Sequence, residues 1–143
     1  MEQKRRYTLG KKDRLKSRKE IELLFKEGAS LSIFPLRVLY ILKKDQISLE
    51  GNLQSTAIFR LQAGFTASSR HFKKAVDRNR VKRLMRESWR LQKNELQLLV
   101  ESNKYILTLF IIYVGKELPE YKSVYEKTSV VLKRLIKLTS ENR

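Results

Sequence analysis

The chain has 143 residues, enough for one domain with a single hydrophobic core. Its 32 Lys and Arg against 15 Asp and Glu give a formal net charge of +17, while 41% of the residues are hydrophobic. So large a positive excess attracts polyanions, and nucleic acid is the expected partner, ahead of an anionic membrane surface. The absence of cysteine excludes disulfides and thiolate metal sites, and the single histidine, His71, excludes a histidine-rich metal site.

The first twelve residues are basic, contain Gly10 and show no sustained apolar period. We therefore expect a basic flexible arm at 1–12, followed by a single domain at 13–143. The start lacks the apolar segment of a signal peptide, and the sequence has no apolar run of about eighteen residues that could span a bilayer. These features predict a cytoplasmic protein without membrane contact.

The first helix is expected at 14–27. Ser17 and Glu20 have the spacing of a capping box, in which each side chain bonds a free backbone amide of the other residue. Apolar residues then recur at helical spacing, at Ile21, Leu24 and Phe25. Gly28 follows, and we expect it to end the helix in the left-handed conformation.

Three runs rich in β-branched and aromatic residues, each bounded by turn formers, predict strands at 36–42, 57–67 and 105–114. Pro35 suits a strand start or edge, and the segment 31–34 either extends the first strand or pairs beside it. Residues 43–55 are expected to connect the first two strands. The run at 105–114 is apolar at nearly every position, which predicts a strand inside the sheet with both faces covered.

Two more helices are expected, one at 74–100 with a possible break near Lys93 and Asn94, and one from Tyr121 to 138. The apolar face of the last helix consists of Val124, Tyr125, Thr128, Val131, Leu132 and Leu135. The resulting order is helix, strands, helix, strand, helix.

The helix at 74–100 sorts its side chains into two faces. With Val81 set at zero and 100° per residue, Leu84, Met85 and Ser88 lie within about 60°, Leu91 lies near the edge at about 80°, and Trp89 marks the other boundary. The opposite face carries Asn79, Lys82, Arg83, Arg86 and Arg90. Further cations precede the helix or open it, at Arg70, Lys73, Lys74, Arg78 and Arg80. Cations at a helix N-terminus oppose the helix dipole unless an anion binds, so this face indicates nucleic-acid binding.

Residues 78–87, RNRVKRLMRE, closely resemble the RNR signature of the bacterial ribonuclease P protein component. The context agrees, because GFTAS at 64–68 leads through a turn to Ala75 and Val76. The first-helix pattern of the family is matched by Leu15, Arg18, Phe25 and Gly28, so that the similarity spans about 13–115. Two positions depart from the family: the turn Arg70-His71-Phe72-Lys73 lacks a glycine, and Ile21 replaces an aromatic residue.

The resemblance implies an α/β sandwich of the order αβββαβα, with a four-stranded mixed sheet packed by helices and a left-handed crossover through the RNR helix. It also implies a subunit of a ribonucleoprotein endoribonuclease that matures the 5′ end of tRNA. The catalytic RNA would cut with Mg²⁺, and the protein would bind that RNA and the 5′ leader of precursor tRNA. The protein would have no active site or cofactor of its own and would be a monomer without RNA.

Carried over by position, the residues expected to bind the catalytic RNA are Arg78, Arg80, Lys82, Arg83 and Arg86, with Asn79 fixing the turn or bonding phosphate. The leader is expected in a cleft between the first helix and the sheet, lined by Phe25 and Tyr40, although both could equally be core residues. A basic RNA-binding or DNA-binding module of the ribosomal type is the alternative function. Autonomous nuclease chemistry is disfavoured, because no pair of carboxylates joins the basic face.

Overall fold

The computed structural model describes residues 9–10, 13–44 and 60–141. Within them, four strands form one sheet in the order β1 (Ala29–Ile33), β2 (Leu36–Lys44), β4 (Tyr105–Tyr113) and β3 (Leu61–Ala67). Four helices complete this part of the chain: α1 (Arg18–Glu27), α2 (Ala75–Gln92), α3 (Asn94–Ser102) and α4 (Tyr121–Glu141). The expected α/β sandwich with a mixed sheet is confirmed, because β3 pairs parallel to β4 while the other pairs are antiparallel.

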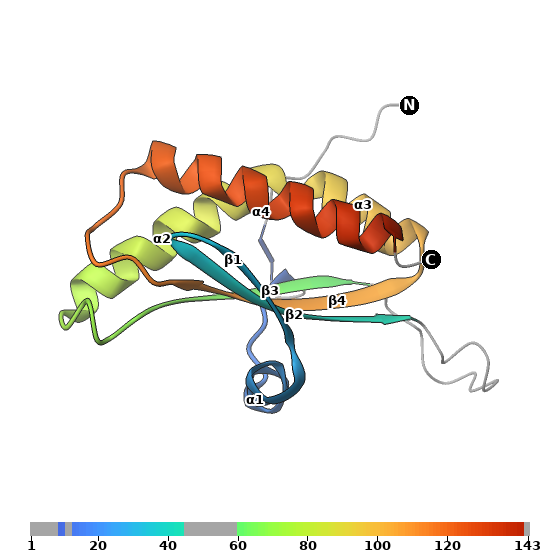
Figure 1. The fold of residues 1–143 in the computed structure, drawn as a ribbon, viewed down its shortest axis with the longest axis horizontal. Helices are drawn as coiled ribbons and strands as arrows, with labels where there is room; N and C mark the ends of the chain where they lie inside the picture. The colour runs from blue at the N-terminus through green and yellow to red at the C-terminus, as the bar shows by residue number, and fades with distance from the viewer. Residues whose placement is uncertain (1–8, 11–12, 45–59, 142–143) are drawn as a thin grey trace.

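The sheet has a thick side and a thin side. In Figure 1, α2, α3 and α4 cover one face, and α1 lies alone against the other. The main core fills the thick side, where Val38 and Leu109 are fully buried. A smaller cluster of Leu15, Leu24 and Leu39 fills the thin side. Alternation along β2 and β4 sends successive side chains to opposite faces and so supplies both clusters.

The position of β4 inside the sheet is confirmed, since it lies between β2 and β3. The expectation that both its faces are covered is only half correct. Its odd-numbered residues are buried on the thick side, whereas its even-numbered residues, Ile106, Thr108, Phe110 and Ile112, are partly exposed on the thin side. Because α1 has only 10 residues, it leaves part of this apolar face open.

The first helix begins later than expected. α1 starts at Arg18 rather than 14, with Ser17 as its N-cap accepting a hydrogen bond from the Glu20 amide. The preceding residues instead lie along the edge of β3, where the Leu15 amide donates to the Ala63 carbonyl at 3.0 Å. Residues 13–16, Asp-Arg-Leu-Lys, carry a single apolar side chain, Leu15, so the helical apolar period begins only at Ile21.

Gly28 ends α1 in an extended conformation, with φ −67° and ψ 147°, so the expected left-handed stop is wrong. The reason for glycine is steric, because a Cβ here would lie 2.4 Å from the Leu24 carbonyl oxygen. β1 follows at once and pairs antiparallel with β2 across Phe34 and a cis Pro35, which settles that the segment 31–34 pairs beside the next strand.

The remaining boundaries shift by a few residues. Lys43 and Lys44 belong to β2 rather than to a loop, and residues 45–59, including the predicted strand start at 57–59, lie outside the described residues. The break near Lys93 is confirmed, with α2 and α3 on either side of it. α4 continues to Glu141. Of the expected arm only Leu9 and Gly10 are described, and Leu9 packs against the main core. The left hand of the crossover stays a prediction.

Candidate nucleic-acid interface

One side of α2 is buried in the core, so its opposite side faces solvent. Val81, Met85, Ser88 and Trp89 are at most 1% exposed. The Ser88 hydroxyl lies 2.9 Å from both the Met85 carbonyl and the Thr128 hydroxyl, so it ties α2 to α4. Leu91, expected near the edge of the core-facing stripe, is 36% exposed and lies outside the core. Trp89 is fully buried rather than at a boundary, because its ring packs edge-on against Phe65 of β3 at 6.3 Å.

The predicted basic face is brought together on the solvent side of α2. Its exposed members are Asn79, Arg80, Arg83 and Arg86, its half-buried members are Lys82 and Arg90, and the exposed Arg70, Lys73 and Lys74 precede the helix. No side chain caps the start of α2, where Lys74 occupies the N-cap. The amides and the cations at this end therefore both favour an anion.

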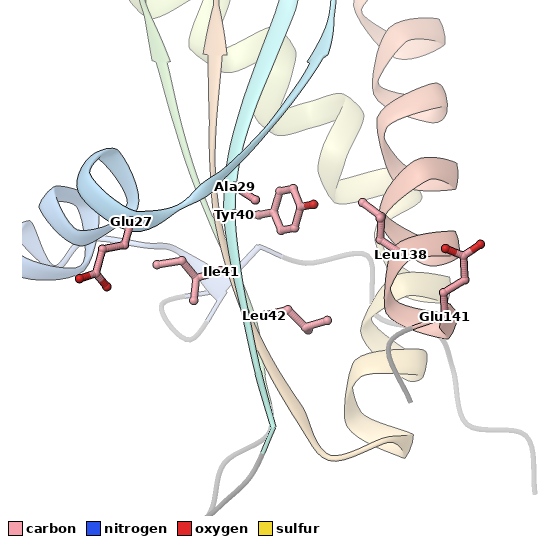
Figure 2. A pocket seen from close by; sticks show the side chains of 7 residues that line it. All are labelled: Glu27, Ala29, Tyr40, Ile41, Leu42, Leu138 and Glu141. Atoms are coloured by element: carbon pink, nitrogen blue, oxygen red, sulfur yellow. The ribbon is translucent and has the colours of Figure 1, made fainter.

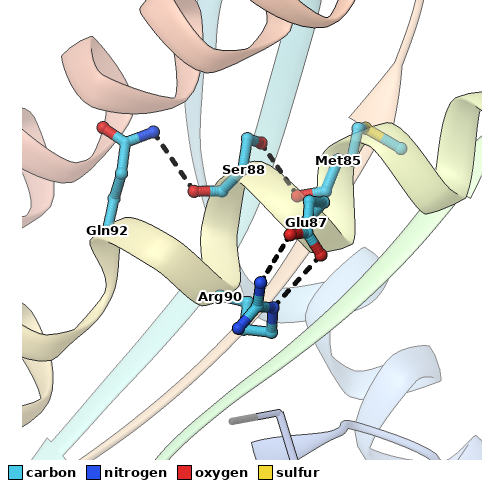
Figure 3. A network of polar contacts seen from close by, with 5 residues as sticks. All are labelled: Met85, Glu87, Ser88, Arg90 and Gln92. Carbon is cyan, nitrogen blue, oxygen red and sulfur yellow. Dashed lines mark hydrogen bonds and ion pairs between the residues drawn. The ribbon is translucent and has the colours of Figure 1, made fainter. Parts of the chain in front are cut away.

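One member of this face is engaged by a carboxylate of the same helix. Figure 3 shows the Arg90 guanidinium against the Glu87 carboxylate, with the Arg90 Nε donating at 3.1 Å. This hydrogen bond lowers the pKa of Glu87 and raises the pKa of Arg90. Arg90 is thus less available to a ligand than the exposed arginines Arg83 and Arg86, for which the described residues supply no ion pair.

Arg78 faces its own backbone rather than solvent alone. One guanidinium nitrogen donates to the carbonyls of Phe72 and Lys73, each at 2.8 Å. This nitrogen closes the preceding turn onto α2, and the expected RNA contact of Arg78 stays a prediction. Counting charges in the sequence cannot predict this structural role of Arg78, since a guanidinium donates hydrogen bonds to a carbonyl as well as to a phosphate.

The turn without glycine is anchored by its aromatic residue. Phe72 is 5% exposed and packs against Tyr113 with ring centroids 5.9 Å apart. The Phe72 amide donates to the Ser68 carbonyl at 3.0 Å, and the Ser68 hydroxyl accepts from the Arg70 amide at 3.2 Å. The turn is thus tight without glycine, and it leaves Arg70 and Lys73 exposed beside the start of α2.

A hollow separates α2 from the segment that leads into α1. It has a volume of about 250 Å³ and is lined by Arg14, Leu15, Lys16, Ala63, Gly64, Phe65, Lys82 and Arg86. Two of the lining cations, Arg14 and Lys16, were missed as site residues by the sequence analysis, which placed the segment at the start of a helix. No local signal in the sequence could have found them, because the path of 13–16 depends on the backbone hydrogen bond from Leu15 to Ala63.

The thin side of the sheet carries the candidate leader cleft. Phe25 of α1 is 58% exposed, and its ring packs edge-on against Phe110 of β4 at 5.7 Å. Ile21, in place of an aromatic residue, is half-buried in the small cluster of this face. The face therefore combines an exposed aromatic ring with a half-open apolar floor.

Tyr40 does not line that cleft. Figure 2 shows its ring on the side of β2 that faces Leu138 of α4, while Ile41 points the other way, toward α1. Tyr40 packs against the main core, whereas Ile41 packs against the small cluster. The expectation that Phe25 and Tyr40 share a cleft is therefore wrong, because neighbouring strand residues alternate between faces and Tyr40 falls on the thick side.

The described residues give no sign of a protein-held metal or of a membrane span. Among them no three His, Asp or Glu side chains gather closely enough to hold a metal ion. None of their helices is long and apolar enough to cross a membrane.

Comparison with known proteins identifies the family. The sequence matches the model of the family Ribonuclease P over residues 9–136, which include the whole basic face. The chain belongs to this family. The ribonuclease P protein component of Porphyromonas gingivalis is 34% identical over 119 residues, covering 82% of this chain and 79% of the relative. Membership in the ribonuclease P protein family supports a role in tRNA processing.

Solved structures of the ribonuclease P family share the fold. The RNase P protein of Thermotoga maritima matches with a TM-score of 0.61 and 26% identity, covering 85% of this chain and 98% of that one. The RNase P protein of Staphylococcus aureus matches with a TM-score of 0.62 at 18% identity, covering 85% and 94% of the two chains. The second likeness, at its low identity, bears on the fold alone.

Proposed function

We propose that this protein is the RNA-binding subunit of ribonuclease P, with the basic face of α2 on the catalytic RNA and the thin side of the sheet on the 5′ leader of precursor tRNA. The main support is the separation of apolar and basic side chains onto opposite sides of α2. Its core side is buried, and exposed cations on its other side lack acidic partners among the described residues. Neutralising RNA phosphates releases counterions and relieves the mutual repulsion of these cations.

The chemistry in this proposal belongs to the RNA. Hydrolysis by the protein would need a positioned acid and base or a carboxylate cluster for metal ions, and the described residues gather no such cluster. Mg²⁺ is therefore assigned to the catalytic RNA, and the protein acts by binding. The site of this activity is the cytoplasm, and the protein is a monomer before it meets RNA.

Leader binding is supported by the chemistry of the thin side. Phe25 offers an exposed ring beside Phe110, and bases stack on such rings with about 1–3 kcal/mol each and little sequence preference. Tolerance of sequence suits leaders, which differ among tRNAs. This contact would distinguish precursor tRNA from mature tRNA.

Reconstitution tests the proposed function. The purified protein alone should leave precursor tRNA intact, and with bacterial ribonuclease P RNA at low Mg²⁺ it should restore 5′ maturation. The double substitution Arg83→Ala and Arg86→Ala should reduce the salt slope of RNA binding by about one to two, because each lost phosphate contact removes about 0.9 or less.

The matched control is Lys133→Ala with Lys137→Ala, which removes the same charge from the exposed side of α4. It should leave both the slope and the stimulation close to those of the parent protein. Failure to stimulate the RNA would contradict the holoenzyme role and leave the function of a general RNA-binding module.

A further inference from the structure

The hollow beside α2 is lined by four cations drawn from two distant parts of the sequence. Arg14 and Lys16 come from the segment before α1, and Lys82 and Arg86 come from the basic face of α2. No acidic residue lines the hollow, and the described residues offer these four side chains no ion pair. Like charges that line one hollow repel one another, and a bound anion relieves that repulsion.

The backbone on the floor of the hollow is fixed. The Leu15 amide bonds the Ala63 carbonyl at 3.0 Å, and the Leu15 side chain is 6% exposed in the small cluster. Gly64 also lines the hollow, and a Cβ there would lie 3.4 Å from the Leu15 carbonyl oxygen. The segment can therefore approach β3 closely, which places Arg14 and Lys16 at the same opening as the α2 cations.

A second contact holds the segment from its other end. The Asp13 carboxylate lies 4.0 Å from the amine of Lys93, which is 3% exposed at the junction of α2 and α3. The same carboxylate accepts a hydrogen bond from the Gly10 amide at 3.1 Å. The only acid of the segment thus faces away from the hollow, toward a buried lysine.

We propose that this hollow binds a backbone phosphate of the catalytic RNA, gripped jointly by Arg14 and Lys16 of the segment and by Lys82 and Arg86 of α2, with Asp13 as a positioning residue. The inference rests on the proposed function and extends the RNA-binding surface of α2 across the edge of β3. A volume of about 250 Å³ has room for a phosphate group with neighbouring water. Arginine on both sides suits forked hydrogen bonds to phosphate oxygens.

A double-substitution cycle tests the shared phosphate. Arg14→Ala and Arg86→Ala should each weaken binding to ribonuclease P RNA, and the double variant should weaken it by at least about threefold less than the product of the single effects, because residues in one network couple. Arg83 lines a different hollow, with Val76, Asn79, Arg80 and Leu84. Arg14→Ala combined with Arg83→Ala should therefore give the full product.

The positioning role of Asp13 predicts a change in RNA affinity opposite in direction to the change expected from its charge alone. Removing an acid from a cationic protein should strengthen its binding to a polyanion, as expected for Glu126→Gln on the exposed side of α4. Asp13→Ala should instead weaken RNA binding, because the segment is no longer held beside α2. Circular dichroism and urea unfolding on each variant verify that the fold persists.

Three outcomes overturn the proposal while leaving the proposed function intact. They are an Arg14→Ala variant that binds the RNA normally, a double variant that shows the full product, and a loss confined to leader-bearing precursor tRNA, which would assign the phosphate to the leader. If Arg83→Ala and Arg86→Ala also leave RNA binding unchanged, the proposed contact surface of α2 fails as well.

Discussion

Lys93 is a charged side chain placed where the domain excludes water. It is 3% exposed, and its amine meets the Gln97 side-chain oxygen and the Asp13 carboxylate. Burial lowers its pKa from the ordinary 10.5, and the attraction of Asp13 and Glu101 opposes that shift only in part. The folded protein therefore holds the proton of Lys93 less tightly than the unfolded chain does.

This difference predicts a pH dependence. Because the unfolded chain binds more protons between the lowered pKa and 10.5, the free energy of unfolding should rise with pH across that window and level off above it. Lys93→Met removes this contribution, so its stability relative to the parent protein should be highest near neutral pH and decline toward pH 10.5. Urea unfolding at several pH values measures the difference, with Lys133→Met on the exposed side of α4 as the control. A constant difference across the window would contradict the assignment.

The burial of Trp89 and the hydrogen bonds of Arg78 could not be predicted from the sequence. Trp89 and Leu91 lie equally far from Val81 on the helical wheel, about 80° to either side, yet only Trp89 is buried. Helical periodicity identifies the apolar stripe of α2, but packing against Phe65 of β3 determines which edge of that stripe is buried. Arg78 belongs to the resembling motif, and its bonds to two carbonyls depend on the path of the turn before α2. Neither outcome follows from local spacing.

At the scale of elements, the junction between α1 and β1 determines how the first helix sits on the sheet. Gly28 donates its amide to the Leu24 carbonyl at 2.9 Å, and no side chain fits beside that carbonyl. Gly28→Ala should lower the free energy of unfolding by about 1–3 kcal/mol, because the junction must shift to admit the Cβ.

The matched control is Gly10→Ala, whose Cβ would meet only the Asp13 carboxylate at 3.9 Å. It should change stability by less than about 0.5 kcal/mol. Urea unfolding of both variants measures the contrast. Equal effects would mean that the loss reflects chain entropy and not the close approach at Leu24.

The positions of the helices and strands were largely predictable from the sequence. The face of the sheet to which a side chain points and the segment that pairs with the edge strand were less predictable. The hydrophobic runs at β2 and β4 and the capped start of α1 carry strong local signals. The residues at 13–16 do not, because their extended path depends on a backbone bond to β3, far away in the sequence. Tyr40 was assigned to the wrong face because β2 alternates evenly between two apolar clusters, so its pattern does not say which cluster lies under α1.

At the scale of the whole molecule, the sheet separates two kinds of surface. Three helices cover its thick side (Figure 1), and the cations of α2 lie on the exposed side of that helix, whereas α1 leaves the thin side half open with aromatic and aliphatic groups. A charged surface binds a phosphate backbone, and an aromatic surface binds unpaired bases. The proposed subunit can therefore hold two RNA strands at once without the two sites competing.

This separation makes Phe25 and Tyr40 a matched pair of aromatic residues on opposite faces. Phe25→Ala should reduce the preference of the reconstituted holoenzyme for precursor over mature tRNA by about tenfold, because it removes a ring worth about 1–3 kcal/mol per stacked base. Tyr40→Leu, which removes a ring on the thick side, should leave that preference unchanged. Equilibrium binding of tRNA with and without the leader measures both. A loss with Tyr40→Leu but not with Phe25→Ala would place the leader on the other face of the sheet and contradict the assignment of the thin side.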